Sequence, residues 1–312
     1  MKYTPIMEKL DLPAKEELLR WDPKALILSE EKAFRQRVIE VFWRAEADES
    51  QVILLSGPTS SGKTTASRIL AEGLTRNGNR AVRISLDDFY KDRVDAPLWE
   101  DGQKNFETIE GLDLDTLGEC MEDLITKGHT KVPIFDFATG TRSPLSRDLT
   151  FDEHTCLIFE GLHALNPRLA PLVEKFRILR LYISVHSDYV DGEGKVLLTA
   201  RELRLLRRLL RDRVRRNTGA AETLRLWDYV LRGENLYMQP YRPLADMHVN
   251  SAHGYEPFLY SREGAAMLRE IEASDPHRDT AERLLAVLDG LPHLDWDLVP
   301  RTSLIQEFID RK

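Results

Sequence analysis

Residues 57–64, GPTSSGKT, have the residue types and the spacing needed to hold a nucleoside triphosphate. They match the pattern G-x-x-x-x-G-K-[ST] at every fixed position. Glycines let successive backbone N–H groups face phosphate oxygens, and a helix beginning at Lys63 adds the positive end of its dipole. Lys63 would then reach the β- and γ-phosphates, and the Thr64 hydroxyl would bind Mg²⁺. We therefore expect ATP and Mg²⁺ to bind here, at Gly57, Pro58, Thr59, Ser60, Ser61, Gly62, Lys63, Thr64 and Thr65.

Two carboxylates are expected beside this loop. Asp87 follows a strand predicted at 81–86, and Glu160 follows a strand predicted at 156–159. In an open α/β sheet, groups at the carboxyl ends of the strands face the ligand crevice. Asp87 would there position or deprotonate an attacking hydroxyl and help to hold Mg²⁺, and Glu160 would take the place of a Walker-B acid. A turn or helix-capping role for Asp87 and a structural role for Glu160 are the alternatives.

A helix predicted at 200–216 is rich in arginine. Five arginines are three or four residues apart and share one helical face: Arg201, Arg204, Arg208, Arg211 and Arg215. Like charges at this spacing repel by roughly 0.2–0.5 kcal/mol per pair. A triphosphate offsets that repulsion through charge-assisted hydrogen bonds, so we expect a lid over the phosphates. The alternatives are a solvated face, a face paired with acids, and an RNA-binding patch.

The elements that must position these residues alternate between strands and helices. Short apolar runs predict strands at 52–55, 81–86, 156–159, 178–184 and 247–250, and helical periodicity predicts helices at 63–76, 114–125 and 200–216. This alternation indicates βαβ units and a mostly parallel sheet, which together make an α/β fold. The base-recognition tetrad N-K-x-D of GTPases does not occur in the sequence.

Both ends of the chain are predicted to be helical extensions packed on this core. Residues 1–49 are charged and periodic, with Ser29 as the candidate cap of a helix that contains Phe34 and Val38. Residues 261–312 show two more helical stripes and end in an irregular apolar stretch. The predicted domains are therefore a core at 50–260, with a lid at about 200–219, and the two extensions.

The composition excludes several classes of protein. The chain has 312 residues, a formal net charge of −8 and a pI near 5.6, which argues against a general nucleic-acid coat protein. Two cysteines, Cys120 and Cys156, cannot form a disulfide framework. No apolar run approaches the roughly 18 residues of a membrane span, and the first residues lack the apolar segment of a signal peptide. We expect a cytoplasmic protein with no membrane or nucleic-acid partner.

Six segments of the sequence carry a resemblance to a known family: GPTSSGKTT (57–65), SLDDFYKDR (85–93), PIFDFATGTR (133–142), FEGLHALN (159–166), RRLLRDRVRRN (207–217) and RPLADMHVNS (242–251). In their order and spacing they resemble the uridine kinase family of P-loop kinases, which is related more distantly to phosphoribulokinase and pantothenate kinase. The resemblance covers about residues 50–260. It implies the three-layer α/β/α sandwich of P-loop NTPases with an arginine-rich helical lid.

Three further segments, at 223–241, 250–257 and 300–309, are similar to one bacterial branch of the family. In that branch a uridine-kinase-like module follows an N-terminal region similar to part of threonyl-tRNA synthetase. This sequence has no counterpart of that region.

The resemblance also implies roles for individual residues. Asp87 falls on the catalytic base, and Glu160 falls with Thr64 on the Mg²⁺ site. Arg208 and Arg211 fall on lid positions that contact the substrate and the phosphates, where they act with Lys63 on the transferred phosphoryl group. The expected acceptor-binding residues are Glu107, where the family has an Asp that binds sugar hydroxyls, and Tyr90, Phe135, Phe137, Arg142 and the further lid residue Arg216.

The sequence departs from the family pattern where the base is read. Uridine–cytidine kinases have a tyrosine and a histidine that read the pyrimidine, and this sequence has Phe135 and Gly140 at those positions. A site loses discrimination when its hydrogen-bonding groups are removed. The tripeptide at 216–218, RNT, replaces an R-G-R pattern, so one lid charge is absent. A base stacked on Phe135 or Phe137, a nonaromatic polyol, and core packing of the two rings are all compatible with the sequence.

The expected function is ATP- and Mg²⁺-dependent phosphoryl transfer to a small-molecule acceptor, with the 5′-hydroxyl of uridine or cytidine first. Another sugar or polyol acceptor is the alternative within the same class of enzyme. The alternative from another class is a nucleotide-sensing or RNA-associated regulator that kept the fold and lost the transfer. A homo-oligomer is compatible with the sequence.

Overall fold

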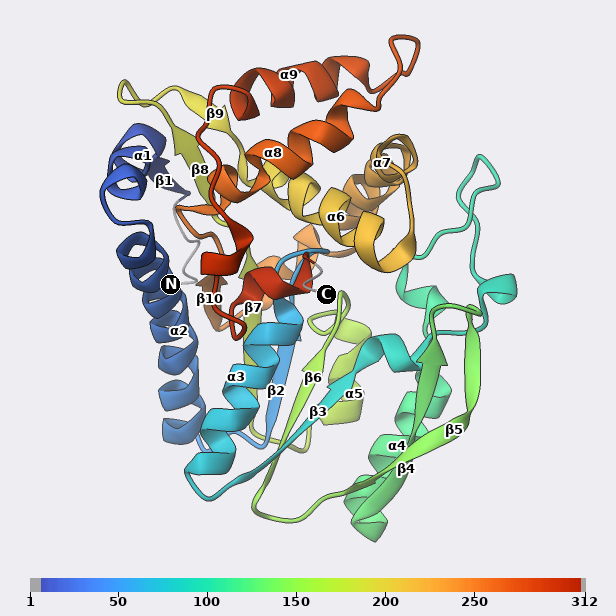
Figure 1. Ribbon diagram of the computed structural model, residues 1–312. Helices are drawn as coiled ribbons and strands as arrows, with labels where there is room; N and C mark the ends of the chain where they lie inside the picture. The colour runs from blue at the N-terminus through green and yellow to red at the C-terminus, as the bar shows by residue number, and fades with distance from the viewer. Residues whose placement is uncertain (1–6, 310–312) are drawn as a thin grey trace.

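Within residues 7–309, which the computed structural model describes, the central sheet has five parallel strands in the order β10-β7-β2-β6-β3 (Figure 1). The strands are β2 (Val52–Ser56), β3 (Arg80–Ser85), β6 (Thr155–Glu160), β7 (Ile178–Ser184) and β10 (Met247–Asn250). They coincide, within a residue or two at each end, with the runs predicted from the sequence. The predicted α/β fold with a parallel sheet is therefore confirmed.

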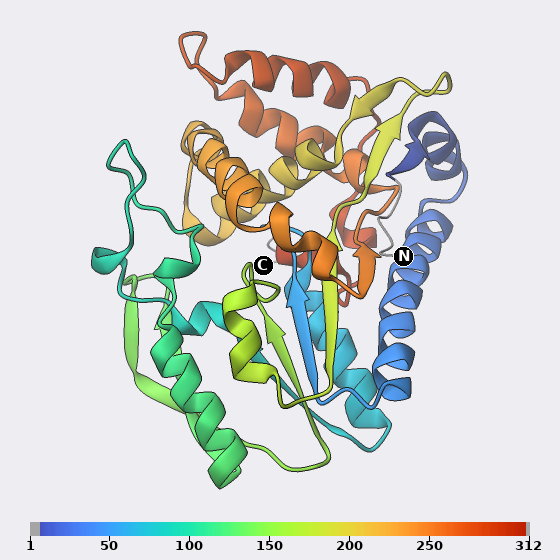
Figure 2. The ribbon, with the colours of Figure 1, turned by 180° about the vertical axis from the view of Figure 1, so that it is seen from behind.

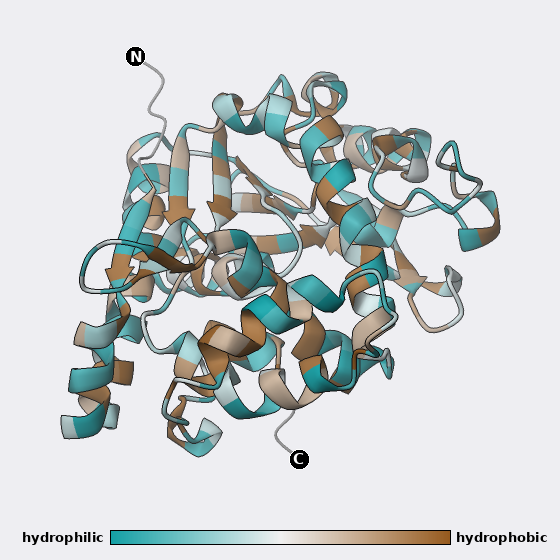
Figure 3. Ribbon diagram, turned by 90° about the horizontal axis from the view of Figure 1, so that it is seen from above, coloured by the Kyte–Doolittle hydropathy of each residue, from teal (hydrophilic) through white to brown (hydrophobic). Residues whose placement is uncertain are grey.

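Helices cover both faces of this sheet, as a comparison of Figures 1 and 2 shows. The covering helices are α2 (Pro23–Ala47), α3 (Lys63–Arg76), α4 (Leu114–Lys127) and α5 (Ala170–Val173). On β2, Ile53 and Leu55 belong to the hydrophobic core that contains residues of α2 and α3, whereas Val52 and Leu54 belong to the core that contains residues of α4 and α5. Because both faces are covered, β2 is apolar along nearly its whole length, and the central ribbons are largely brown in Figure 3.

Further helices gather at the carboxyl end of the sheet (Figure 1). They are α6 (Ala200–Arg216), α7 (Ala220–Tyr237), α8 (Glu256–Arg269) and α9 (Arg278–Leu288). Helix α6 begins with a capping box formed by Thr199 and Glu202, and it ends at Asn217 in the left-handed conformation, with φ 51°. Leu203 and Leu206 of α6 are fully buried, so the helix is fixed over the end of the sheet.

Within residues 7–309, two smaller sheets lie outside the central one, and neither was predicted from the sequence. The strands β4 (His129–Asp136) and β5 (Thr141–Thr150) form an antiparallel hairpin. In the other sheet, β8 (Ser187–Val190) pairs in parallel with β1 (Glu8–Asp11) and antiparallel with β9 (Val196–Leu198). The hairpin carries Phe135, so it positions one of the predicted acceptor residues.

The N-terminal segment differs from its prediction in two ways. It contains the strand β1 before its helices α1 (Leu12–Trp21) and α2. Helix α2 also begins earlier than expected, because the Asp22 carboxylate accepts a hydrogen bond of 3.0 Å from the Ala25 N–H. Ser29 lies inside the helix and donates to the Leu26 carbonyl, so its prediction as the cap was wrong. Asp22 followed by Pro23 is the stronger signal for a helix start.

The chain after the lid returns to the sheet end. Helix α8 runs across the boundary expected at residue 260, and the last described residues cross the first turn of α3 (Figure 1). Residues 1–6 and 310–312 of the expected extensions lie outside the described residues, and the division into core and extensions stays a prediction.

No helix in the described part of the chain is long and apolar enough to span a membrane. The 3-10 helices are η1 (Leu86–Phe89), η2 (Arg93–Asp95), η3 (Ile109–Gly111), η4 (Pro167–Leu169), η5 (Gln239–Leu244), η6 (Trp296–Leu298) and η7 (Leu304–Glu307).

Candidate active site

The glycine-rich loop, residues 57–62, joins β2 to α3 at the carboxyl end of the sheet. Gly62 has φ 88°, and a Cβ on Gly57 would lie 2.1 Å from the Ile183 carbonyl oxygen, so both positions require glycine. The hydroxyls of Ser60 and Ser61 are buried and have no hydrogen-bond partner in the described part of the chain. A polyphosphate offers acceptors to such donors, so the loop fits that ligand.

Lys63, the first residue of α3, lies among the charged groups of the site. Its ammonium donates hydrogen bonds to the carbonyl oxygens of Gly57, at 2.8 Å, and Pro58, at 3.1 Å. Burial lowers the pKa of Lys63, and the negative charges of Asp87 and Glu160 oppose that shift. Lys63 is therefore within electrostatic reach of both predicted carboxylates.

The register of the sheet brings these two carboxylates to the loop. Glu160, the last residue of β6, pairs with Leu55 of β2 on one side and with Ser85 of β3 on the other. The loop begins two residues after Leu55, and Asp87 follows two residues after Ser85. Three neighbouring strands thus end at one site, where parallel sheets bind their ligands.

Both carboxylates are desolvated. Burial raises the pKa of Asp87, and the charge of Lys63 acts against that rise. Burial also raises the pKa of Glu160 to about 7, and Arg83 lies 3.8 Å from its carboxylate. Two neighbouring carboxylates that resist ionisation are stabilised by a cation. Asp87 and Glu160 are thus chemically suited to that cation.

Thr64, in the first turn of α3, has an exposed side chain, so its hydroxyl is accessible to a metal. Residues 7–309 contain no cluster of three or more His, Cys, Asp or Glu side chains suited to a metal ion. Mg²⁺ does not require such a cluster, because it is commonly held by one or two carboxylates together with substrate phosphates. The predicted set of Thr64, Asp87 and Glu160 fits that mode of binding.

Arginines of α6 contact the phosphate loop. Arg204 donates to the Thr59 carbonyl at 2.9 Å, and Arg211 donates to the Thr59 hydroxyl at 3.3 Å. Arg207 donates to the Ser60 carbonyl at 3.1 Å. Arg201, at the start of the predicted arginine face, is exposed. The helix therefore lies against the loop through its central turns.

Acids pair with the same arginines, as the alternative interpretation of this face predicts. Asp212 is only 1% exposed in its side chain, and it lies 3.1 Å from Arg208, 2.8 Å from Arg211 and 3.5 Å from Arg216. Arg204 forms a buried ion pair with Glu234. The positive charges of Arg216 and Arg211 act against the raised pKa of Asp87, which burial causes. Asp212 thus gathers three lid arginines, two of them within electrostatic reach of the predicted base.

Glu107 lies against α7 and faces the lid. A Cβ on Gly233 would lie 2.2 Å from the Glu107 Cβ, so glycine is required for this approach. Burial raises the pKa of Glu107 to about 7, against the opposing charges of Arg208 and Lys63. A carboxyl group between the lid and the loop is suited to bind the hydroxyl groups of an acceptor.

The aromatic residues predicted to bind the acceptor form one group. The ring of Phe135 packs edge-on against Tyr90, with 5.9 Å between centroids, and against Phe137, with 5.1 Å. Phe135 is 9% exposed and Phe137 is 53% exposed, so Phe137 offers the accessible ring. Burial raises the pKa of Tyr90, and the charges of Asp87 and Glu107 add to that rise. Tyr90 therefore connects the aromatic group to the two carboxylates.

Two other positions on the hairpin have structural contacts. Gly140 has φ 73°, a backbone conformation that favours glycine, and a Cβ there would lie 2.8 Å from the guanidinium carbon of Arg93, so a side chain at this position requires Arg93 to move. Arg93 also donates to the Phe137 carbonyl at 2.9 Å. Arg142 lies 3.1 Å from the carboxylate of Asp113, the N-cap of α4. Arg142 thus ties the hairpin to α4.

Sequence reasoning missed two residues at the loop. Arg207 lies off the predicted arginine face, and its only signal is the arginine-rich segment that contains it. Glu307 accepts a hydrogen bond of 2.7 Å from the Thr65 N–H. Glu307 is 242 residues away along the chain, and its local sequence carries no signal for this contact.

Residues 52–253 match the model of the Phosphoribulokinase / Uridine kinase family. A uridine kinase of Staphylococcus aureus (strain JH9) is 28% identical over 214 residues, which cover 69% of this chain and 88% of that protein. A structure titled "a Possible Uridine Kinase from Bacillus stearothermophilus" has a TM-score of 0.47 at 16% identity and covers 69% of this chain and 97% of its own. The structure of phosphoribulokinase from Rhodobacter spheroides has a TM-score of 0.42 at 20% identity, and the match covers 64% of this chain and 70% of that chain.

Proposed function

The chain belongs to the phosphoribulokinase/uridine kinase family, and from that membership we propose that it transfers the γ-phosphoryl group of ATP to a hydroxyl of a small molecule. The preferred acceptor is the 5′-hydroxyl of a nucleoside. The observation that carries the proposal is the convergence of Lys63, Asp87 and Glu160 at the ends of three neighbouring strands. A phosphate-binding lysine beside two carboxylates is what phosphoryl transfer to a hydroxyl requires.

The phosphate loop would hold the donor. Its backbone N–H groups, the buried hydroxyls of Ser60 and Ser61, and the ammonium of Lys63 are the groups that bind phosphate oxygens. Thr64, Asp87 and Glu160 would hold Mg²⁺, which supplies positive charge at the phosphate oxygens when bound. Arg211, which contacts the loop through Thr59, places a further positive charge beside these phosphates.

Asp87 would act on the acceptor hydroxyl. Its position after β3 puts the carboxylate within electrostatic reach of Lys63, Arg211 and Arg216. A carboxylate there would accept a hydrogen bond from the attacking hydroxyl and take its proton as the hydroxyl oxygen bonds to the γ-phosphorus, while the bond from that phosphorus to the β–γ bridging oxygen breaks and ADP leaves. Lys63 and the lid arginines stabilise the charge on the transferred group.

Glu107 and the aromatic group would bind the rest of the acceptor. Glu107 would accept hydrogen bonds from ribose hydroxyls, because it lies between the lid and the loop. The exposed ring of Phe137 would stack on the base. This arrangement recognises a flat ring without reading its hydrogen-bonding groups.

A sugar or polyol acceptor is the second candidate, and Gly140 favours it. The turn at Gly140 has φ 73°, which favours glycine over a residue with a base-reading side chain, and Arg93 occupies the adjacent space. Phe135 in turn has no phenol to offer, so the base-reading pair of the uridine–cytidine kinases has no equivalent here. A smaller acceptor would use Glu107 and Asp87 without a base.

A coupled ADP-release assay with ATP, Mg²⁺ and a panel of nucleosides, sugars and polyols tests the proposal. We expect at least one acceptor to raise the rate of ADP release well above the rate that the protein shows without an acceptor. The phosphomonoester product should be identified by ³¹P NMR. Stimulation by nucleosides alone supports the first candidate, and stimulation by sugars or polyols alone supports the second. If no acceptor raises the rate and no phosphomonoester forms, the proposed transfer is wrong.

A further inference from the structure

The last described residues, 300–309, form a segment that we call the strap, and it lies across the phosphate loop (Figure 1). Its apolar side chains Leu304, Ile305 and Phe308 are at most 1% exposed. The strap is therefore packed into the protein over the nucleotide-binding element, although it is remote from that element in sequence.

The carboxylate of Glu307 sits at the start of the phosphate-loop helix. It accepts a hydrogen bond of 2.7 Å from the N–H of Thr65, the third residue of α3. The first N–H groups of a helix have no partner within the helix, and they are the groups that bind phosphate. Glu307 thus places a negative charge where a phosphate-loop protein binds its anionic ligand.

Leu304 covers the loop backbone beside this contact. A Cβ on Gly62 would lie 1.7 Å from Leu304 Cδ1. The leucine therefore packs directly on the backbone of the second motif glycine. A ligand that approaches Gly62 from this side meets an apolar side chain.

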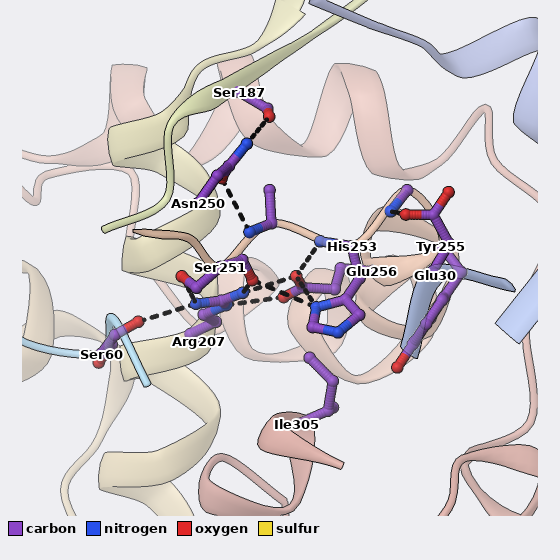
Figure 4. A network of polar contacts seen from close by, with 12 residues as sticks. Glu30, Ser60, Ser187, Arg207, Asn250, Ser251, His253, Tyr255, Glu256 and Ile305 are labelled. Carbon is purple, nitrogen blue, oxygen red and sulfur yellow. Dashed lines mark hydrogen bonds and ion pairs between the residues drawn. The ribbon is translucent and has the colours of Figure 1, made fainter. Parts of the chain in front are cut away.

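The strap is also tied to the lid helix. Arg215 of α6 donates hydrogen bonds of 3.1 Å to the carbonyl oxygens of Gln306 and Glu307. The guanidinium of Arg207 lies over the Phe308 ring, 5.0 Å from its centroid. Figure 4 shows Arg207 between Ser60 of the loop and Glu256, with Ile305 of the strap directed toward the same network.

A second anchor holds the start of the strap. The Ser303 hydroxyl donates to Glu31 of α2 at 2.5 Å, and the Tyr255 hydroxyl donates to the same carboxylate at 2.5 Å. The strap is thus held at its start by Glu31 of α2 and farther along by Arg215 of the lid helix, and Glu307 lies at the contact with the lid. Glu307 itself is only partly buried, whereas Ser303 is 2% exposed.

We propose that the strap is an autoinhibitory cover of the phosphate loop, in which Glu307 takes the place of a phosphate group on α3 and ATP binds only after Glu307 has left. The proposal rests on the proposed function, since it concerns access to the same nucleotide site. Release of Glu307 would also remove the support that the strap gives to Arg215, so opening of the cover and movement of the lid are coupled.

Equilibrium titration with Mg²⁺ and a nonhydrolysable ATP analogue tests the proposal in the full chain. Glu307→Gln keeps an acceptor for the Thr65 N–H and removes the charge, whereas Glu307→Ala removes both. We expect the Kd of the analogue to fall roughly 3- to 10-fold in Glu307→Gln and further in Glu307→Ala. Asp297→Asn, an exposed acid of the same tail, is the matched control and leaves the Kd unchanged. Affinity that is unchanged or weaker in both Glu307 variants would overturn the proposal.

Hydrogen–deuterium exchange of the strap peptide separates failure of this proposal from failure of the proposed function. We expect the strap amides of the wild-type chain to be protected without ligand and to lose protection when the analogue binds. Binding of the analogue with the strap still protected, or an unprotected strap before ligand is added, refutes the cover alone. If the strap of the wild-type chain is protected and the Glu307 variants still bind no analogue, nucleotide binding itself is refuted. The proposed displacement of Glu307 by ATP is then refuted as well.

Discussion

Glu107 and Gly233 are in direct contact, since a Cβ atom on Gly233 would lie 2.2 Å from the Cβ of Glu107. Gly233 lies inside α7, where glycine is costly for a helix, by about 1 kcal/mol relative to alanine. The cost is explained by the close approach of the carboxyl group that we propose binds the acceptor. The contact thus links a helix-interior glycine to substrate binding.

Gly233→Ala should displace Glu107 and lower kcat/KM for the acceptor by about 10- to 100-fold, because small misplacements of a positioning group are amplified in the rate. The KM for ATP should change little, since the phosphate loop is not touched. Gly118→Ala in α4 is the matched control, because its Cβ would meet Leu172 at an ordinary 3.6 Å. Steady-state kinetics that show the same loss in both variants would contradict the positioning role.

The same carboxyl group should make stability depend on pH. Burial raises the pKa of Glu107 from 4.5 to about 7, so the folded chain binds this proton more tightly than the unfolded chain does. Protonated Glu107 therefore makes its full contribution to the free energy of unfolding below pH 4.5. That contribution is lost as the pH rises from 4.5 through about 7. Urea unfolding across this range should show a shallower decline in Glu107→Gln than in the wild type. Equal slopes in both proteins would show that Glu107 ionises freely.

The buried ion pair of Arg207 and Glu256 should dominate local stability (Figure 4). Neither side chain is exposed, and their closest atoms are 2.6 Å apart. Glu256→Gln leaves Arg207 with an uncompensated buried charge, and we expect a loss of about 3–5 kcal/mol in urea unfolding. Glu222→Gln, which breaks a surface pair with Arg225, should cost about 0–1 kcal/mol. A similar cost for both substitutions would contradict this reading of the network.

Acid should reveal the same pair in a different range of pH. Burial alone would raise the pKa of Glu256, but Arg207 and the hydrogen bonds to the carboxylate lower it to about 2. The stabilisation is then present above the ordinary pKa of 4.5 and is lost as the pH falls from 4.5 to about 2. Glu256→Gln should remove that acid-dependent loss. An unaltered acid transition in the variant would show that other groups cause it.

The central sheet could be predicted because its signals are local. Each buried strand is a short apolar run bounded by turns, and the motif at 57–64 identifies the loop that follows the first of them. Asp87 and Glu160 could be placed together because parallel strands end at one edge of the sheet. They lie near Lys63 because β6 pairs with both β2 and β3 in a register that aligns the ends of the three strands.

The other parts of the site depend on contacts that local sequence does not encode. The hairpin of β4 and β5 contains Pro133 and several charged residues, so its strands lack a continuous apolar run. The pairing of Arg204 with Glu234 and the contact of Glu307 with Thr65 join residues far apart in the chain. Asp22 is different, because its capping signal, an Asp followed directly by a proline, is present in the local sequence and is stronger than that of Ser29.

The role of Asp87 is tested most directly by single-turnover transfer of the γ-phosphoryl group to the best acceptor from the panel. We expect Asp87→Asn to lower the transfer rate by about 10²- to 10⁴-fold while the Kd of the ATP analogue stays near the wild-type value. Asp95→Asn, an exposed acid of the same connecting segment, should transfer at the wild-type rate. An Asp87→Asn protein that transfers as fast as the wild type would contradict the proposed mechanism.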